Sequence, residues 1–251
     1  MSTIFGALCN EYYVSSRLFL KLELTLQRET ILHFFDTIRR EFPDMRKFRR
    51  RDSGTFMLEE EPIEGLSRRW LRLDPGSLRF GYYAPPDLDA VRAMSDVVLE
   101  HAPYHLTFSD IDFDYLELIY GFDLEYRGNH DQLVAETLYS DHPFAGILMS
   151  DETAHIIECQ PYFGIALTPE CDLQAYVEVK SRTSSFEVRT GEYEPQPLSV
   201  FLTVRKYWGF GAPGTLVDAQ RQLFERADDV AANKVVPVLV NPLAHAIASR
   251  S

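Results

Sequence analysis

Hydrophobic and polar side chains alternate along residues 116–126, LELIYGFDLEY. The even positions are all apolar or aromatic, whereas the odd positions include Glu117, Asp123 and Glu125. A period of two residues is typical of a β-strand that is buried on one face. Because a βαββα pattern precedes this segment and further strands follow it, we expect it to be a strand that two parts of the sheet share.

A second alternating segment begins at Arg17. Leucines occupy positions 18, 20, 22, 24 and 26, and mostly polar residues lie between them. This pattern predicts a half-buried strand over 17–26. Residues 1–15 show no usable period, and we expect them to form a flexible arm or an edge segment.

Apolar residues at spacings of three and four predict the helices. In the first half, they indicate a helix over 28–42 that Pro43 ends and a helix over 87–102 that stops before Pro103. Later helices are expected over 130–139 after an N-cap at Asn129, over 215–233 after an N-cap at Thr215, and over 243–248. Because Pro237 and Pro242 interrupt the last part, we expect VVPVLV to be extended.

Turn-forming residues separate several short strand patterns. Asp52-Ser53-Gly54 lies between 46–51 and 55–61, and Asp74-Pro75-Gly76 lies between 70–73 and 78–82, so each set predicts a hairpin. Strands are further expected over 155–167, 172–189 and 198–204.

These elements predict an α+β fold with antiparallel strands and helices packed on one face. The order in residues 1–126 resembles a ferredoxin-like βαββαβ unit with an extra hairpin. Residues 127–251 are expected to form a second α+β half that shares or extends the sheet and ends in a helix and a tail. A strand followed by a helix occurs at both 18–26 and 116–126, which leaves a tandem arrangement as an open alternative.

The composition is that of an ordinary globular protein, with 45% hydrophobic and 25% charged residues. A formal net charge of −13 opposes non-specific binding to nucleic acid or to an anionic membrane. The three cysteines, Cys9, Cys159 and Cys171, have no CxxC spacing, so they indicate neither a disulfide framework nor a zinc knuckle. Without a signal-peptide pattern at the first residues, we expect a cytosolic protein that does not bind membranes.

The loop 209–215, GFGAPGT, follows a strand pattern and precedes a helix, and it matches GxGxxG. A phosphate loop would have lysine before the final hydroxyl residue, whereas this loop has Gly214 before Thr215. Only 36 residues follow Thr215, and they contain no second parallel strand pattern. We therefore interpret the loop as a turn that needs small residues and expect no cofactor.

The densest acidic group is Asp110, Asp112 and Asp114 in SDIDFDY. Carboxylates at alternate positions offer oxygen ligands for Mg²⁺ or Ca²⁺, although Tyr115 and Gly121 stand where a calcium loop requires glycine and glutamate. The same alternation lets the aspartates face water while the intervening residues face inward. We favour this solvated face and retain the three aspartates as weak metal candidates.

No motif argues for an enzyme, because GxSxG and HExxH are missing from the sequence. His101 and His105 are four residues apart, but Pro103 between them is expected to prevent the helix that would align them as ligands. We expect His130 to be exposed in the first turn of its helix, beside Asp131.

The strongest local departure from the acidic background is the basic run Arg46, Lys47, Arg49, Arg50 and Arg51. Arginine suits bidentate binding of carboxylate or phosphate. The alternative, which we favour, is that the run pairs with Glu59–Glu61 on the facing strand of its own hairpin.

Our leading hypothesis is a non-enzymatic protein-binding or assembly protein that contacts a partner or a copy of itself. Two features motivate it: sheet edges that need covering, and the apolar tail Val235–Ile247, which needs a surface to pack on. One alternative is an RNA-binding or nucleotide-binding module that uses the arginine-rich hairpin. Another is a metal-dependent phosphoesterase that uses the three aspartates.

Overall fold

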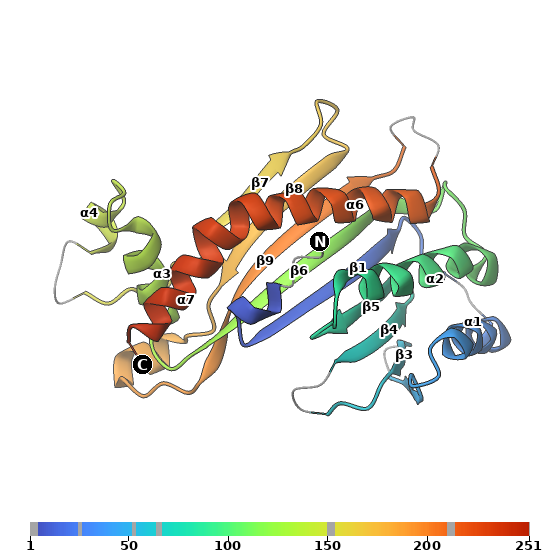
Figure 1. Cartoon of the computed structure of the whole chain (residues 1–251), viewed down its shortest axis with the longest axis horizontal. Coiled ribbons are helices and arrows are strands. Elements are labelled where there is room, and N and C mark those ends of the chain that lie inside the picture. Colours follow the sequence, from blue (N-terminus) through green and yellow to red (C-terminus); the bar gives the residue numbers. More distant parts are fainter. Residues whose placement is uncertain are drawn as a thin grey trace.

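The computed structural model describes residues 5–24, 27–51, 54–63, 67–149, 154–209 and 214–250. A nine-stranded antiparallel sheet with the order β2-β3-β4-β5-β1-β6-β9-β8-β7 forms its centre (Figure 1). The chain is therefore an α+β protein, as the sequence predicts. The strands are β1 (Glu11–Leu20), β2 (Lys47–Arg50), β3 (Phe56–Glu59), β4 (Arg68–Asp74), β5 (Ser77–Tyr83), β6 (Phe113–Tyr126), β7 (Tyr162–Ala166), β8 (Leu173–Lys180) and β9 (Gln196–Tyr207).

The long helices α1, α2, α6 and α7 all lie on one side of the sheet, and its other side carries none of them (Figure 1). The apolar core lies between these helices and the sheet. The helices are η1 (Phe5–Leu8), α1 (Arg28–Glu41), α2 (Leu88–Leu106), α3 (His130–Tyr139), α4 (Ala145–Leu148), α5 (Ser185–Thr190), α6 (Leu216–Val230), the π-helical η2 (Ala231–Val240) and α7 (Asn241–Ala248).

Strand β6 is the shared strand that the sequence predicts. It pairs with β1 on one side and with β9 on the other, and both pairings are antiparallel. Its even positions from Leu116 to Leu124 are buried against the helices, as a two-residue period requires. The two predicted hairpins are also confirmed, because β2 pairs with β3 and β4 pairs with β5.

The predicted limits of the first strand, 17–26, are wrong, because the strand covers Glu11–Leu20. Strand β1 begins at Glu11, inside the segment expected to be an arm or an edge, and it occupies the middle of the sheet. The pairing with β6 shifts register between Phe19 and Leu20, and the strand ends there, so Leu22 is 72% exposed. Ser16 lies on the buried face, where its hydroxyl accepts a hydrogen bond from Gln220 at 2.7 Å. This polar position interrupts the apolar pattern and hides the start of the strand.

Helix α2 continues through Pro103 to Leu106, so the predicted stop before proline is wrong. Proline lacks only one backbone donor, and a position in the last turn limits the loss. Ala102 and Leu106 are buried on either side of Pro103, and this packing favours the helical path. The helix ends at Thr107, whose φ of 56° is left-handed.

The C-terminal segment is also helical, which overturns the expected extended tail. Helix α6, η2 and α7 follow one another without a break from Leu216 to Ala248. Asn241 N–H donates to the carbonyl of Val236, a spacing of five residues that passes over Pro237. Val235, Val236, Leu239, Val240 and Leu243 are buried, so the tail packs on its own domain. By length and composition alone this helix could cross a membrane, and 39% of its most apolar stretch is buried inside the protein.

Two strands of the second half are shorter than predicted. Strand β7 covers five residues, and β8 ends at Lys180. Residues 185–190 form helix α5, because Ser184 and Glu187 form a capping box and Gly191, with a φ of 73°, ends the helix. The S-x-x-E signal was present in the sequence.

A partly buried polar contact joins helices α2 and α6 to the central strand β6. Tyr120 of β6 donates its hydroxyl proton to Asp228 of α6 at 2.6 Å, and Arg92 of α2 forms an ion pair with the same carboxylate at 2.5 Å. Burial raises the pKa of Asp228, and both partners oppose that shift. This contact fixes α2 and α6 relative to β6.

His130, which we expected to be exposed, is only 2% exposed, and Asp131 beside it is 1% exposed. Asp131 accepts hydrogen bonds from Cys159 N–H at 2.7 Å and from the Ser181 hydroxyl at 2.6 Å. Its carboxylate therefore connects α3 with the segment that leads into β7 and with the end of β8.

The neutral form of His130 is the one that its surroundings accommodate. Its Nδ1 accepts from Arg182 N–H at 3.3 Å, and its Nε2 lies 3.2 Å from the carbonyl of Tyr126. Burial lowers the pKa of His130 below its usual value of 6.5. A second proton on the ring would break the bond to Arg182 N–H.

We expect the free energy of unfolding to be smaller at about pH 5 than at about pH 7, in part because of His130, which resists protonation in the folded chain. The unfolded chain binds a proton below the usual histidine pKa, whereas the folded chain resists it until the pH reaches the lowered value. The contribution of His130 to stability is therefore fully present above the usual histidine pKa. It is lost as the pH falls from that value to the lowered pKa of the folded chain. Urea denaturation at both pH values should show a smaller loss for His130→Gln than for wild type. The exposed His245→Gln should not change the loss.

Candidate functional site

The basic run forms the edge strand β2 and its two ends. Lys47 Nζ lies 3.0 Å from Glu61, and Arg49 lies 3.2 Å from Glu59. The predicted pairing with the facing acidic residues is confirmed at these two positions. Half of the Arg49 side chain is exposed, so its ion pair is a surface contact of small energy.

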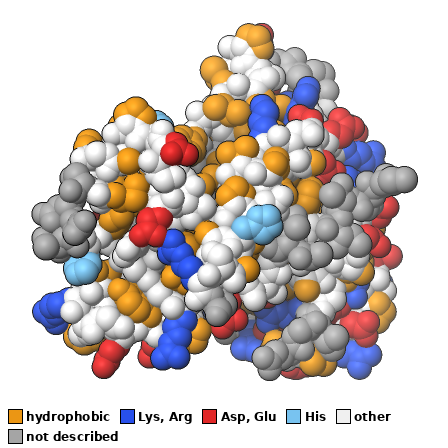
Figure 2. All heavy atoms as spheres, turned by 60° about the vertical axis from the view of Figure 1, so that its left-hand side comes forward, with side chains coloured by type: hydrophobic (Ala, Val, Ile, Leu, Met, Phe, Trp, Pro, Cys, Tyr) orange, Lys and Arg blue, Asp and Glu red, His pale blue; other side chains and the backbone are white. Residues whose placement is uncertain are grey.

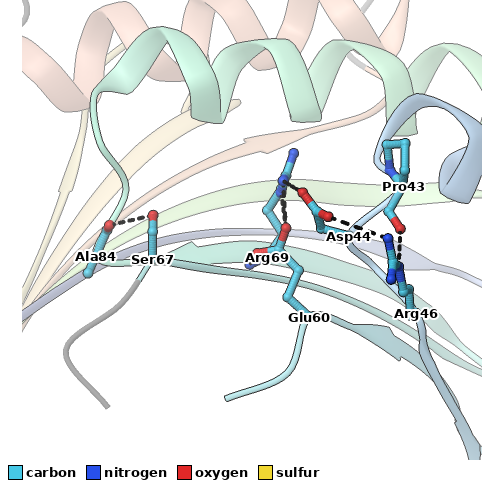
Figure 3. Close-up of polar contacts among 7 residues, drawn as sticks. All are labelled: Pro43, Asp44, Arg46, Glu60, Ser67, Arg69 and Ala84. Atoms are coloured by element: carbon cyan, nitrogen blue, oxygen red, sulfur yellow. Dashed lines mark hydrogen bonds and ion pairs between the residues drawn. The ribbon is translucent and has the colours of Figure 1, made fainter. Parts of the chain in front are cut away.

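Arg46 is directed back toward the end of α1 (Figure 3). Its Nε donates to the carbonyl of Pro43 at 3.0 Å. The Asp44 carboxylate lies between Arg46 and Arg69, 4.0 Å from each, and Arg69 in turn binds Glu60. Arg46 is thus part of a chain of alternating charges within the protein.

The remaining basic residues of this region do not converge on one point. Arg50 lies over the ring of Phe56, and the backbone N–H of Arg51 donates to Thr55. Arg39 and Arg40 of α1 both pair with Asp36. The structure therefore places most of the basic residues of this region against the protein's own carboxylates.

Asp110, Asp112 and Asp114 do not alternate along one strand, because β6 begins only at Phe113. The side chain of Asp112 accepts from the N–H and the hydroxyl of Ser109, which stabilises the turn before β6. Within the described ranges, no group of three histidine, cysteine or acidic side chains is arranged to hold a metal ion.

Four residues of the glycine-rich loop, 210–213, lie outside the described residues. Thr215 is described, and its hydroxyl forms the N-cap of α6 together with Asp218. The Thr215 hydroxyl therefore caps the N-terminus of α6 by accepting a hydrogen bond from Asp218 N–H.

Because α2 continues through Pro103, His101 and His105 lie on one side of it, contrary to expectation. Their ring centroids are 5.9 Å apart, and the ring of His33 on α1 lies 4.8 Å from His105. Burial, and then the neighbouring His33 and His101, lower the pKa of His105. The three rings line the α1–α2 contact, which is a structural interface of this chain.

The sheet face opposite the long helices is lined with aromatic rings. Tyr13 on β1 lies between Tyr83 on β5 and Phe201 on β9, with ring centroids at 5.3 and 6.3 Å. Gly121 makes this possible, because a Cβ there would lie 2.2 Å from the Tyr13 ring. This row of rings crosses the centre of the sheet.

A row of charged residues crosses the same face. Arg17, Glu117 and Arg205 occupy paired positions on β1, β6 and β9. Arg205 binds the buried Glu117 at 2.9 Å, whereas the Nε of Arg17 has no hydrogen-bond partner in the described part of the chain. Burial and the neighbouring Arg79 lower the pKa of Arg17 to about 10. Arg17 stacks on Phe19, 3.4 Å from the ring centroid.

The other edge strand, β7, differs from β2 in that it carries no charged side chain. Its sequence is YFGIA, without a charged residue, and all five residues are exposed. Tyr162, Phe163 and Ile165 are 61%, 55% and 48% exposed. Figure 2 turns the left-hand side of Figure 1 forward, and hydrophobic side chains lie over much of it among scattered charged ones. An exposed apolar edge is a site where another strand can pair.

Sequence reasoning missed this site. The alternating pattern covers 155–167, and nothing in it indicates that five residues would lie at the edge of the sheet. The one signal was the uncharged run 161–167 in an acidic chain. Comparisons with known protein families and with curated proteins find no match for this chain, so its surfaces carry the functional argument.

Arg205 and Arg49 should differ in their effect on stability. Arg205→Ala leaves the Glu117 carboxylate, 5% exposed, without its cation, and should lower the free energy of unfolding by about 2 kcal/mol or more. Arg49→Ala removes an exposed pair and should lower it by no more than about 1 kcal/mol. Urea denaturation measures both. Equal losses of unfolding free energy in the two variants would contradict the conclusion that Arg205 neutralises a buried carboxylate whereas Arg49 forms only a surface ion pair.

Proposed function

We propose that this chain is a non-enzymatic protein-binding or assembly protein that presents β7 to a strand of another polypeptide. The observation that carries the proposal is the edge itself: five consecutive exposed residues without a charge, paired with β8 on one side only. Pairing at a sheet edge gives affinity through backbone hydrogen bonds and specificity through alternate side chains.

The contrast between the two edges supports this proposal. Strand β2 carries Lys47, Arg49 and Arg50, and charged side chains on an edge strand prevent further pairing. Strand β7 has no such protection. On this proposal, the arginine-rich run prevents another strand from pairing with β2, and the uncharged edge strand β7 binds the partner. The cytosolic location expected from the sequence is part of the same proposal.

We also propose that residues 1–126 and 127–251 are two variants of one unit. The strand order supports this, because the shared strand β6 lies beside β1, and outward from this pair the strands follow in reverse chain order on both sides, β5-β4-β3-β2 beyond β1 and β9-β8-β7 beyond β6. The antiparallel order β6-β1-β5-β4 supports a ferredoxin-like description of the first half, with β2 and β3 as the extra hairpin.

Selection from a random nonapeptide display library on the immobilised protein tests the proposed function. Ala166→Pro removes the N–H of an edge residue without adding charge, and Ala166→Ser, which keeps the N–H, is the matched control. Selected peptides should bind wild type and Ala166→Ser alike and should bind Ala166→Pro roughly tenfold or more weakly, by fluorescence anisotropy. Failure to select any peptide on a monomeric protein, or equal binding to all three proteins, would overturn the proposal.

The open sheet face favours a second candidate function, the binding of single-stranded nucleic acid. Aromatic rings such as Tyr13 offer stacking surfaces for bases, and Arg17 offers a cation without an ion-pair partner in the described residues. This candidate differs from the arginine-run hypothesis, because the contacts lie on the central strands.

Binding of a fluorescent oligouridine should then weaken steeply with salt. Arg17→Gln should reduce the affinity at low salt, whereas Arg49→Gln, at the protected edge, should leave it unchanged. Anisotropy that shows no binding at low salt, or an affinity indifferent to salt, would dispose of this candidate.

A further inference from the structure

We propose that the strand which pairs with β7 belongs to a second copy of this chain, bound about a two-fold axis that passes through Gly164. The inference rests on the proposed function, because it names the partner of the same edge. It joins two nine-stranded sheets into one continuous antiparallel sheet.

The hydrogen bonds to β8 show which backbone groups of β7 are available. Leu167 N–H donates to Leu173, and Val179 N–H donates to the carbonyl of Pro161. Backbone groups of neighbouring residues point to opposite sides of an antiparallel strand. Odd-numbered residues therefore bond to β8, and the N–H and C=O groups of Tyr162, Gly164 and Ala166 point outward from the sheet.

These outward groups are arranged for pairing with themselves. In an antiparallel pair about Gly164, each Gly164 bonds to the other copy's Gly164, and Tyr162 bonds to Ala166 of the partner subunit. All three outward residues of β7 then donate and accept. A two-fold axis at Tyr162 or at Ala166 would leave two of the three without a partner in the other copy's β7.

The side chains also suit this register. Phe163 and Ile165 point to the helix side, where each would lie opposite the other type in the second copy and form one apolar cluster across the axis. On the open face, Tyr162 would lie opposite the small Ala166 of the partner subunit. Gly164 carries no Cβ, and the ring of Tyr176 lies over it, 2.9 Å from where a Cβ would be.

The two edges of the sheet favour a closed dimer over an open filament. A filament would pair β7 of one copy with β2 of the next, and would bring Lys47, Arg49 and Arg50 against the uncharged YFGIA edge. Pairing β7 with β7 uses the same surface twice and closes. The charged edge strands then lie at the two ends of the joined sheet.

Sedimentation equilibrium of the full chain tests the inference. Wild type should dimerise, and Ile165→Lys and Phe163→Glu should each weaken the dimer by about a hundredfold or more, because each places an unpaired charge in the cluster. Mixing the two variants should restore a heterodimer, since position 165 of one copy faces position 163 of the other and the other side keeps its native pair. Ile111→Lys, at a residue 80% exposed elsewhere, is the control and should remain dimeric.

Hydrogen exchange shows that the variants still fold and that β7 is the interface. The amides of Phe163 and Ile165 should stay protected by β8 in wild type and in Ile165→Lys. Those of Tyr162, Gly164 and Ala166 should be protected in the wild-type dimer only. Loss of protection at all five amides would mark a misfolded variant, and Phe163→Glu and the mixing experiment would then decide.

Failure of this inference is distinguishable from failure of the proposed function. A monomer at every concentration, together with selected peptides whose binding depends on Ala166, would overturn self-pairing and leave the edge as a site for another protein. A dimer that both charge variants leave intact would overturn it as well. A monomer that also binds no peptide at β7 would overturn both.

Discussion

The pairing of β1 with β6 is the contact on which the rest of the structure depends. These two strands lie side by side at the centre of the sheet, and β6 also pairs with β9, so it connects the strands of both parts of the chain. Their alternating side chains create the apolar face that the long helices cover, and the contact of Tyr120, Asp228 and Arg92 fixes α2 and α6 on that face. Every other strand is added outward from this pair, so the sheet has two free edges.

An open sheet must either protect its edges or use them. On the proposed function, both solutions occur in one molecule. Strand β2 carries the basic run, and its charges are balanced by carboxylates on β3 and in the segment after it. Strand β7 is uncharged and exposed, and the buried Asp131 holds the segment that leads into it. The arginine-rich run, the strongest local departure from the acidic background, therefore lies on an edge strand, where two of its residues pair with the hairpin's own carboxylates.

Local patterns predicted most of the elements and failed where packing outweighs local preference. The alternation in 116–126 and the hairpin turns at Asp74-Pro75-Gly76 need no tertiary contact to be recognised. Pro103, Pro237 and Pro242 were interpreted as helix ends, but burial of the apolar residues around them stabilises the helix despite the missing donors. Ser16 interrupts the apolar pattern of its strand, and the sequence gives no sign that Gln220, 204 residues away in the chain, donates a hydrogen bond to its buried hydroxyl.

The sequence by itself determined the α+β class, the strand at the centre of the sheet and the pairing of Lys47 and Arg49 with acidic residues of their own hairpin, because short-range periodicity and turn chemistry encode them. Only the tertiary structure decided that β2 and β7 are the two edges, that His130 and Asp131 are buried, and that the C-terminal helix packs on its own sheet. Position within a sheet depends on pairing between segments that are distant in the chain. No local pattern records which strand will be the last one.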